Sequence, residues 1–182
     1  CNLRCEFCPT HFGKNNISLK AIQLISKFNP KVMVITGGGE PSLWREDKKK
    51  IYDLIMEIRK YMGKIPLGIM SNGTFLMPKE AIEQLKWLRI SVNSFDKDQY
   101  KVVHKMDMFD RVLKNILEYA KMDLPELGIG FVYTKRTAKD LINVIKTINE
   151  RILSNLSKDN LKKINVQFRP EADPKTYSRH FL

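Results

Sequence analysis

The 182-residue sequence contains no cysteine after residue 8 and no apolar run close to the roughly 20 residues that a membrane-spanning helix needs. Only 9 glycines and 8 prolines are present, which excludes a collagen-like or low-complexity chain. A hydrophobic content of 43% excludes a disordered one. Because the 3 cysteines lie within eight residues, they cannot form a disulfide framework for a body of this size. The length fits one compact domain.

Acidic residues are in the minority, since 20 Asp and Glu face 32 Lys and Arg and leave a formal charge of +12. Such an excess can attract nucleic acid or another anionic partner. The cations are scattered, however, and the triplet at residues 48–50 is expected to open an amphipathic helix. No segment interleaves basic with aromatic residues, as grooves for single-stranded nucleic acid do. A solvated basic surface is therefore favoured, and nucleic acid is the weaker expectation for a partner.

Short apolar runs alternate with segments of helical spacing along the whole chain. Strands are expected at residues 32–36, 67–71, 88–92, 128–133 and 164–168. Helices are expected from Ser18 to Phe28, at 51–62, after Pro78, at 110–122 and at 141–152, the last with a capping box at Thr137 and Asp140. This alternation predicts a parallel sheet with right-handed crossovers, either an open doubly wound sheet or a (β/α) barrel. In both, chemistry gathers beyond the carboxyl ends of the strands.

Cys1, Cys5 and Cys8 form a C-x3-C-x2-C segment. Three thiolates on one loop can bind three corners of a cuboidal iron–sulfur cluster and leave one iron open to another ligand. Two alternatives remain at this point: a zinc site with His11 as the fourth ligand, or a redox pair of Cys5 and Cys8. Thiols that stay unpaired indicate a reducing compartment, so we expect a cytoplasmic protein.

Polar residues follow several expected strands. The segment from Thr36 to Pro41 holds three glycines and Glu40, which suits close approach of a ligand with an ammonium group, although a plain βα turn with an exposed Glu would look the same. Ser71 and Asn72 end the next strand, where Asn-Gly is also a common turn dipeptide. The candidates at later strand ends are Ser91 and Asn93, which the period of two places on one face, and Arg169. Arg169 could clamp a carboxylate or phosphate, or pair with Glu171 or Asp173.

The segment CNLRCEFC at residues 1–8 resembles the cluster loop of the radical S-adenosylmethionine (radical SAM) enzymes, with Phe7 in the aromatic position. The resemblance implies a [4Fe–4S] cluster on Cys1, Cys5 and Cys8 whose fourth iron chelates S-adenosylmethionine. It also implies reductive cleavage to methionine and a 5′-deoxyadenosyl radical that abstracts hydrogen from a substrate. The implied fold is an α/β partial (β/α)6 barrel.

The resemblance assigns cofactor contacts to residues that match the family's motifs. Gly38, Gly39 and Glu40 match the Gly-Gly-Glu motif that binds the methionine amino group. Ser71, and second Asn72, take the place of the residue that contacts the methionine carboxylate, while Ser91 and Asn93 take that of the ribose contact. Ile129 or Val132 could pack on adenine, but a plain core strand is the better interpretation there. Phe7 and Arg169 complete the expected cofactor-binding set. His104 and His180 receive no role.

The resemblance extends from Cys1 to about Pro170. Since the family's first strand runs directly into the cysteine loop, we expect residues 1–182 to be a radical SAM core domain that lacks this strand and could be truncated at the C-terminus as well. The expected partner is an electron donor of the flavodoxin or ferredoxin type, and the substrate is unidentified. The alternative from another class is a non-catalytic zinc or iron–sulfur module with a basic RNA-binding surface.

Overall fold

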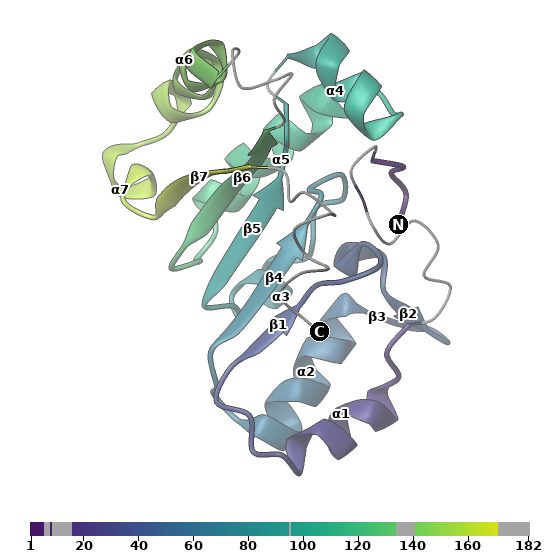
Figure 1. The fold of residues 1–182 in the computed structure, drawn as a ribbon. Coiled ribbons are helices and arrows are strands. Elements are labelled where there is room, and N and C mark those ends of the chain that lie inside the picture. Colours follow the sequence, from purple (N-terminus) through teal and green to yellow (C-terminus); the bar gives the residue numbers. More distant parts are fainter. Residues whose placement is uncertain (6–7, 9–15, 95, 134–140, 171–182) are drawn as a thin grey trace.

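The computed structural model describes residues 1–5, 8, 16–94, 96–133 and 141–170 (Figure 1). Within them, one parallel sheet has the strand order β1-β4-β5-β6-β7. Its strands are β1 (Met33–Ile35), β4 (Leu67–Ser71), β5 (Trp87–Ser91), β6 (Leu127–Tyr133) and β7 (Ile164–Pro170). The five expected strands are therefore confirmed, with ends that differ by at most two residues. A small antiparallel hairpin, β2 (Arg45–Glu46) and β3 (Lys49–Lys50), stands apart from the sheet.

Helices connect the parallel strands. They are α1 (Leu19–Ser26), α2 (Ile51–Met62), α3 (Lys79–Ile82), α4 (Lys97–His104), α5 (Phe109–Lys121), α6 (Leu141–Arg151) and α7 (Lys158–Leu161), with short 3-10 turns η1 (Pro41–Leu43) and η3 (Leu153–Asn155). Ser18 caps α1 as expected, because its side chain accepts a hydrogen bond from the Ala21 N–H. The capping box expected at Thr137 and Asp140 lies outside the described residues.

Two elements differ from expectation for local reasons. The helix after Pro78 has only one turn, since β5 begins at Trp87 and little chain remains between them. Lys49 and Lys50 belong to the β2–β3 hairpin, and α2 begins only at Ile51, where the Lys50 N–H donates to the Asp53 carboxylate. Helix α4, which the sequence analysis did not predict, begins where Asp96 caps it.

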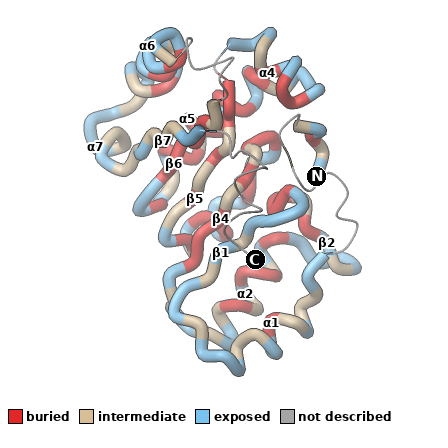
Figure 2. Tube along the Cα trace, viewed as in Figure 1, coloured by how far each residue is buried: buried red, intermediate tan, exposed pale blue. Residues whose placement is uncertain are grey.

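The core lies between the sheet and the helices behind it (Figures 1 and 2). On β5, Leu88 and Ile90 have no exposed surface and join the same cluster of apolar residues as Ile116 of α5 and Ile55 of α2. Arg89 alternates with these two residues and is only half-buried, which places it on the opposite face of the sheet. One face of the sheet is thus the core, and the other is open for polar side chains.

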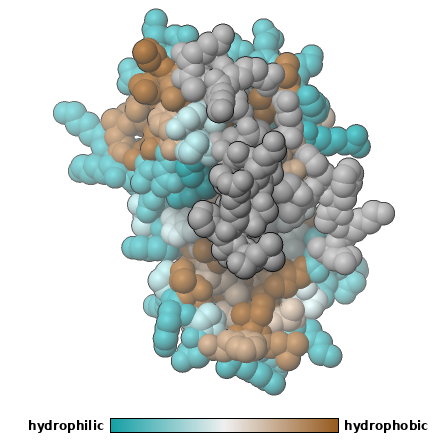
Figure 3. Space-filling model, viewed as in Figure 1, coloured by the Kyte–Doolittle hydropathy of each residue, from teal (hydrophilic) through white to brown (hydrophobic). Residues whose placement is uncertain are grey.

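Some large apolar side chains stay exposed, and Figure 3 shows hydrophobic areas over α6 and around α1. Leu24 of α1 and, just after this helix, Phe28, Val32 and Val34 are exposed, and the side chain of Phe28 is 86% exposed. β1 is also an edge strand of the described sheet. Among the described helices, none has the length and apolar character needed to cross a bilayer.

Candidate functional site

Glu40, Ser71 and Asn72 meet beyond the carboxyl ends of β1 and β4. One carboxylate oxygen of Glu40 accepts hydrogen bonds from the Ser71 hydroxyl at 2.6 Å and from the Ser42 N–H at 3.0 Å. The other oxygen accepts from the Asn72 N–H at 2.7 Å. These strands are neighbours in the sheet, with Ile35 in register with Ile69, so their ends must lie side by side. The expected grouping of these three residues is thus what the structure has.

The Glu40 carboxylate is held rigidly but retains binding capacity. Glu40 is only 6% exposed, and its side chain also caps the η1 turn. A carboxylate offers about four lone-pair sites, of which the three donors occupy three. About one acceptor position is left, which fits a single strong donor such as an ammonium group. The sequence interpretation of an exposed Glu on a plain turn does not apply to this residue.

Side chains of α5 hold the turn after β4 in place through hydrogen bonds to its backbone. Gly73 has a φ of +73°, and a Cβ built there would lie 2.6 Å from the Ile90 side chain, so a residue with a side chain does not fit. The Asn115 amide donates to the Gly73 carbonyl at 2.7 Å. The Tyr119 hydroxyl donates to the Phe75 carbonyl and accepts from the Met77 N–H, each at 2.9 Å. Helix α5 therefore determines where Ser71 and Asn72 stand.

The same turn contacts the start of the cysteine segment. The Asn72 amide donates to the Asn2 side-chain oxygen at 3.0 Å and lies 3.8 Å from the Cys1 sulfur. The Asn2 amide in turn donates to the Thr74 hydroxyl at 3.0 Å. Residues 70 and 72 positions apart in the sequence are thus joined by direct hydrogen bonds, and Cys1 is brought to the end of β4.

Cys5 is anchored on the other side by His104, a residue to which the sequence analysis gave no role. Its sulfur lies 2.9 Å from His104 Nδ1, and His104 Nε2 lies 2.9 Å from the Val92 carbonyl oxygen. The Arg4 N–H also donates to the His104 carbonyl at 3.2 Å. Burial, and then the nearby Cys8, raises the pKa of the Cys5 thiol to about 11. No spacing signal could have revealed His104, because its contact depends on where α4 ends.

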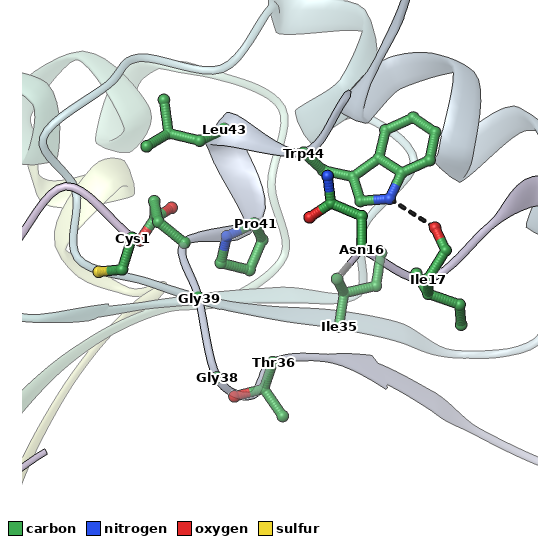
Figure 4. Close-up of a pocket in the computed structure, with 11 residues that line it drawn as sticks. Cys1, Asn16, Ile17, Ile35, Thr36, Gly38, Gly39, Pro41, Leu43 and Trp44 are labelled. Atoms are coloured by element: carbon green, nitrogen blue, oxygen red, sulfur yellow. Dashed lines mark hydrogen bonds between the residues drawn. The ribbon is translucent and has the colours of Figure 1, made fainter. Parts of the chain in front are cut away.

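A cavity of about 240 Å³ lies between Cys1 and Trp44 (Figure 4). Cys1, Gly38, Gly39 and Glu40 line it. Trp44 is on the opposite wall, with its indole N–H donating to the Ile17 carbonyl at 2.8 Å. The remaining lining residues are Asn16, Ile17, Ile35, Thr36, Pro41 and Leu43. The cavity therefore opens against the glycines and the carboxylate of the predicted Gly-Gly-Glu motif.

The later candidates stand apart from this group. Asn93 has a φ of +58°, a conformation that Asn tolerates, and its side-chain oxygen accepts from the Val132 N–H at 3.0 Å. Ser91 and Arg169 belong to β5 and β7 and lie on the open face of the sheet. Ile129 has no exposed surface and belongs to the core, as expected for a plain core strand.

The structure does not test the predictions made for five residues. Phe7, His11, Glu171, Asp173 and His180 lie outside the described residues. The predicted contribution of Phe7 to the cofactor site and the predicted pairing of Arg169 with either carboxylate therefore stay predictions.

The donor chemistry of the site fits an iron–sulfur cluster with an amino-acid ligand. The three cysteines are thiols without a disulfide between them, and Cys5 and Cys8 are near enough to interact electrostatically. The Tyr100 hydroxyl is buried without a hydrogen-bond partner among the described residues. Burial, and then the charges of Cys5 and Glu40, raise its pKa. Within the described ranges, no three His, Cys, Asp or Glu side chains converge as metal ligands. Joint ligation by Cys1, Cys5 and Cys8 thus stays a prediction.

Comparisons with curated proteins connect this site to a family. A family model described as the Radical SAM superfamily matches residues 1–148. A protein of Sulfurisphaera tokodaii named probable GTP 3′,8-cyclase is 30% identical over 155 residues, which are 80% of this chain and 48% of that protein. A 7-carboxy-7-deazaguanine synthase of Bacteroides thetaiotaomicron is 34% identical over 113 residues, or 58% of this chain and 56% of that protein. The chain spans about half the length of the curated relatives it matches.

Solved structures share the fold. Streptococcus suis SuiB bound to S-adenosylmethionine superposes with a TM-score of 0.65 at 19% identity, covering 97% of this chain and 40% of that one. Native anSMEcpe with bound AdoMet gives a TM-score of 0.64 at 20% identity, covering 96% and 50%. The five-stranded parallel sheet is thus the expected type, consistent with a partial barrel. The chain belongs to the radical SAM superfamily, whose cofactors are a [4Fe–4S] cluster and S-adenosylmethionine.

Proposed function

We propose that this chain is the core domain of an enzyme that cleaves S-adenosylmethionine reductively and uses the resulting radical to abstract hydrogen from a substrate. The observation that supports it most directly is the hydrogen-bonded group of Glu40, Ser71, Asn72 and Cys1. It joins the predicted amino-group acceptor, the predicted carboxylate contacts and a predicted cluster ligand at one edge of the sheet. The curated relatives bear different activity names, so they single out no substrate.

Cys1, Cys5 and Cys8 would hold the cluster, whose reduced form supplies the electron for cleavage. Glu40 accepts the methionine ammonium with its remaining lone pair, next to Gly38 and Gly39. These residues act by binding and orienting the methionine part of the cofactor, so that it would reach the open iron in one geometry.

Ser71 and Asn72 are placed to meet the carboxylate of the same amino acid. The Ser71 hydroxyl already donates to Glu40, and one N–H of the Asn72 side-chain amide donates to Asn2. The second Asn72 N–H, which faces the Cys1 sulfur at 3.8 Å, is the donor that can serve a ligand. Ser91, Asn93 and Phe7 are proposed to contact the nucleoside part. Of these, Asn93 keeps only its amide N–H groups for a ligand, because its oxygen binds the Val132 N–H.

The setting of the reaction follows from the cofactors. An electron donor of the flavodoxin or ferredoxin type would reduce the cluster, and a reducing compartment such as the cytoplasm would keep the three thiols available. We treat residues 1–182 as one catalytic core domain of the radical SAM type.

Anaerobic reconstitution with iron and sulfide, followed by dithionite and S-adenosylmethionine, tests the proposal. We expect 5′-deoxyadenosine and methionine in equal amounts from the wild-type protein and neither from Cys8→Ala. Lys101→Ala, an exposed change on α4, should leave the yield unchanged. A colourless protein that binds one zinc tightly and never cleaves S-adenosylmethionine would instead support the non-catalytic zinc alternative.

A further inference from the structure

Arg89 is placed on the open face of the sheet in the middle of β5. Its neighbours along the strand, Leu88 and Ile90, point into the core, so Arg89 points away from it. On that face Arg89 is in register with Gly128 of β6, and Ser91 is in register with Gly130. In Figure 3 a hydrophilic area lies where Figure 1 draws β5 and β6.

The two glycines give the Arg89 side chain a path across β6. A Cβ built on Gly128 would lie 3.4 Å from Arg89 Cγ and Nε, and one on Gly130 would lie 3.5 Å from Arg89 Cδ. The side chain thus lies over the glycine backbone of β6, with Cδ next to Gly130 and Nε next to Gly128. Behind it, the Trp87 ring lies directly on Gly68, and the Arg89 guanidinium is 5.7 Å from that ring.

Among the described residues, the Arg89 guanidinium has the Trp87 ring as a neighbour but no anionic partner. Its Nε is buried without an acceptor within that part of the chain, and no described carboxylate forms a salt bridge with it. A buried donor without an acceptor is costly, which makes such groups rare in folded proteins. Burial and the charge of Arg169 both lower the pKa of Arg89, while Glu126 acts more weakly in the opposite direction.

Arg169 supplies a second cation near the same place. It lies on β7 in register with Val132, beyond Gln167, which is in register with Gly130. Arg89 and Arg169 therefore lie on the same face of the sheet, close enough for their charges to repel each other. A bound anion would satisfy the Arg89 donors and remove this repulsion.

We propose that Arg89 and Arg169 form a binding site for the substrate's anionic oxygen group, a phosphate or a carboxylate, on the open face of the sheet. This inference rests on the proposed function, because it concerns the substrate of that reaction. The site is separate from Glu40, Ser71 and Asn72, which meet at the ends of β1 and β4. An anion held over β6 would position a substrate next to the cofactor, and Arg169, expected from the sequence to bind the cofactor, would bind the substrate instead.

Calorimetric titration of the reconstituted protein with inorganic pyrophosphate and, separately, with glutarate tests the site. The two probes distinguish a phosphate from a carboxylate as the group that it binds. We expect one probe to bind, and Arg89→Gln and Arg169→Gln each to weaken it at least about tenfold, as loss of a charge-assisted hydrogen bond should. Arg89→Lys should retain part of the affinity. Arg111→Gln, an equal charge change on exposed α5 surface, should retain all of it. Melting curves exclude unfolding, and Arg169 is exposed, so its variant tests the site even if Arg89→Gln fails to fold.

Three results would overturn the inference: binding of neither probe, an equal loss in Arg111→Gln, or displacement of the probe by S-adenosylmethionine, which would make the anion the cofactor's own carboxylate. The 5′-deoxyadenosine assay on the wild-type protein without substrate runs in parallel. Cleavage without anion binding rejects only this site, whereas anion binding without cleavage rejects the proposed function.

Discussion

The Cys5 sulfur and His104 Nδ1 lie 2.9 Å apart, although the two residues are 99 positions apart in the sequence. His104 Nε2 faces the Val92 carbonyl, which can only accept, so Nε2 bears the proton and Nδ1 accepts from the Cys5 thiol. Tyr100 packs on the imidazole with ring centroids 4.2 Å apart. His104 is 1% exposed, so these contacts tie the cysteine segment to the core rather than to a surface helix.

Replacing His104 with Phe should therefore loosen the cysteine segment while it keeps a ring against Tyr100. Both imidazole contacts disappear, and we expect a loss of about 1–3 kcal/mol in the free energy of unfolding of the metal-free protein, measured in urea. Iron should also be lost faster to a chelator after reconstitution. Lys101→Ala on the same helix is the control. Unchanged stability together with unchanged iron retention would contradict this role.

Glu40→Gln should weaken S-adenosylmethionine binding by about tenfold or more, because the ammonium loses a charged acceptor. Gln has a single acceptor oxygen, and its NH2 group cannot accept, so either the Asn72 or the Ser42 N–H loses its acceptor and a lower unfolding midpoint is expected. Equilibrium dialysis and thermal melting measure the two effects. Glu80→Gln, an exposed change on α3, should alter neither. Full affinity in Glu40→Gln would show that the carboxylate serves only the loop.

Gly73→Ala should destabilise the protein more than Gly63→Ala. Both glycines have positive φ, +73° and +64°, so each change brings a backbone penalty of about 1–3 kcal/mol. Only at Gly73 would the new methyl group meet a neighbour, the Ile90 side chain at 2.6 Å, which adds about 1–3 kcal/mol of overpacking. Urea unfolding of the two variants gives the difference directly. Equal losses would mean that Ile90 moves aside.

Tyr119→Phe should lower stability by about 1–3 kcal/mol, because the buried Met77 N–H loses its acceptor and the Phe75 carbonyl loses its donor. Tyr52→Phe, at a half-exposed position of α2, removes a hydroxyl without this consequence. Chemical unfolding of both proteins provides the test. If the two variants behave alike, the turn after β4 does not depend on α5 through this hydroxyl.

Asn93→Gly should cost about 1–3 kcal/mol, since it preserves the positive φ but leaves the Val132 N–H without an acceptor. Asn93→Asp retains an acceptor oxygen at the same place and should cost less. Thermal unfolding of the two variants ranks them. The reverse order would show that the Asn93 side chain does not support β6.

Local sequence patterns were sufficient to predict the strands and the order of the elements. They also predicted that Glu40, Ser71 and Asn72 lie just beyond strand ends, where one ligand could contact all three. Apolar runs and helical spacing are local properties, and parallel strands in one sheet necessarily bring their carboxyl ends to one edge. For the same reason Arg169 could be placed near that edge, and Ile129 in the core, before any contact was known.

The partners of individual polar side chains could be identified only from the three-dimensional packing. His104 contacts Cys5 because α4 ends beside the cysteine segment. Arg89 Nε has no acceptor among the described residues, because Gly128 and Gly130 place no side chain next to it. Such contacts depend on distances between residues far apart in the chain, and these distances are fixed by how helices pack on the sheet. Local sequence patterns specify the elements, whereas packing determines which buried polar groups find partners.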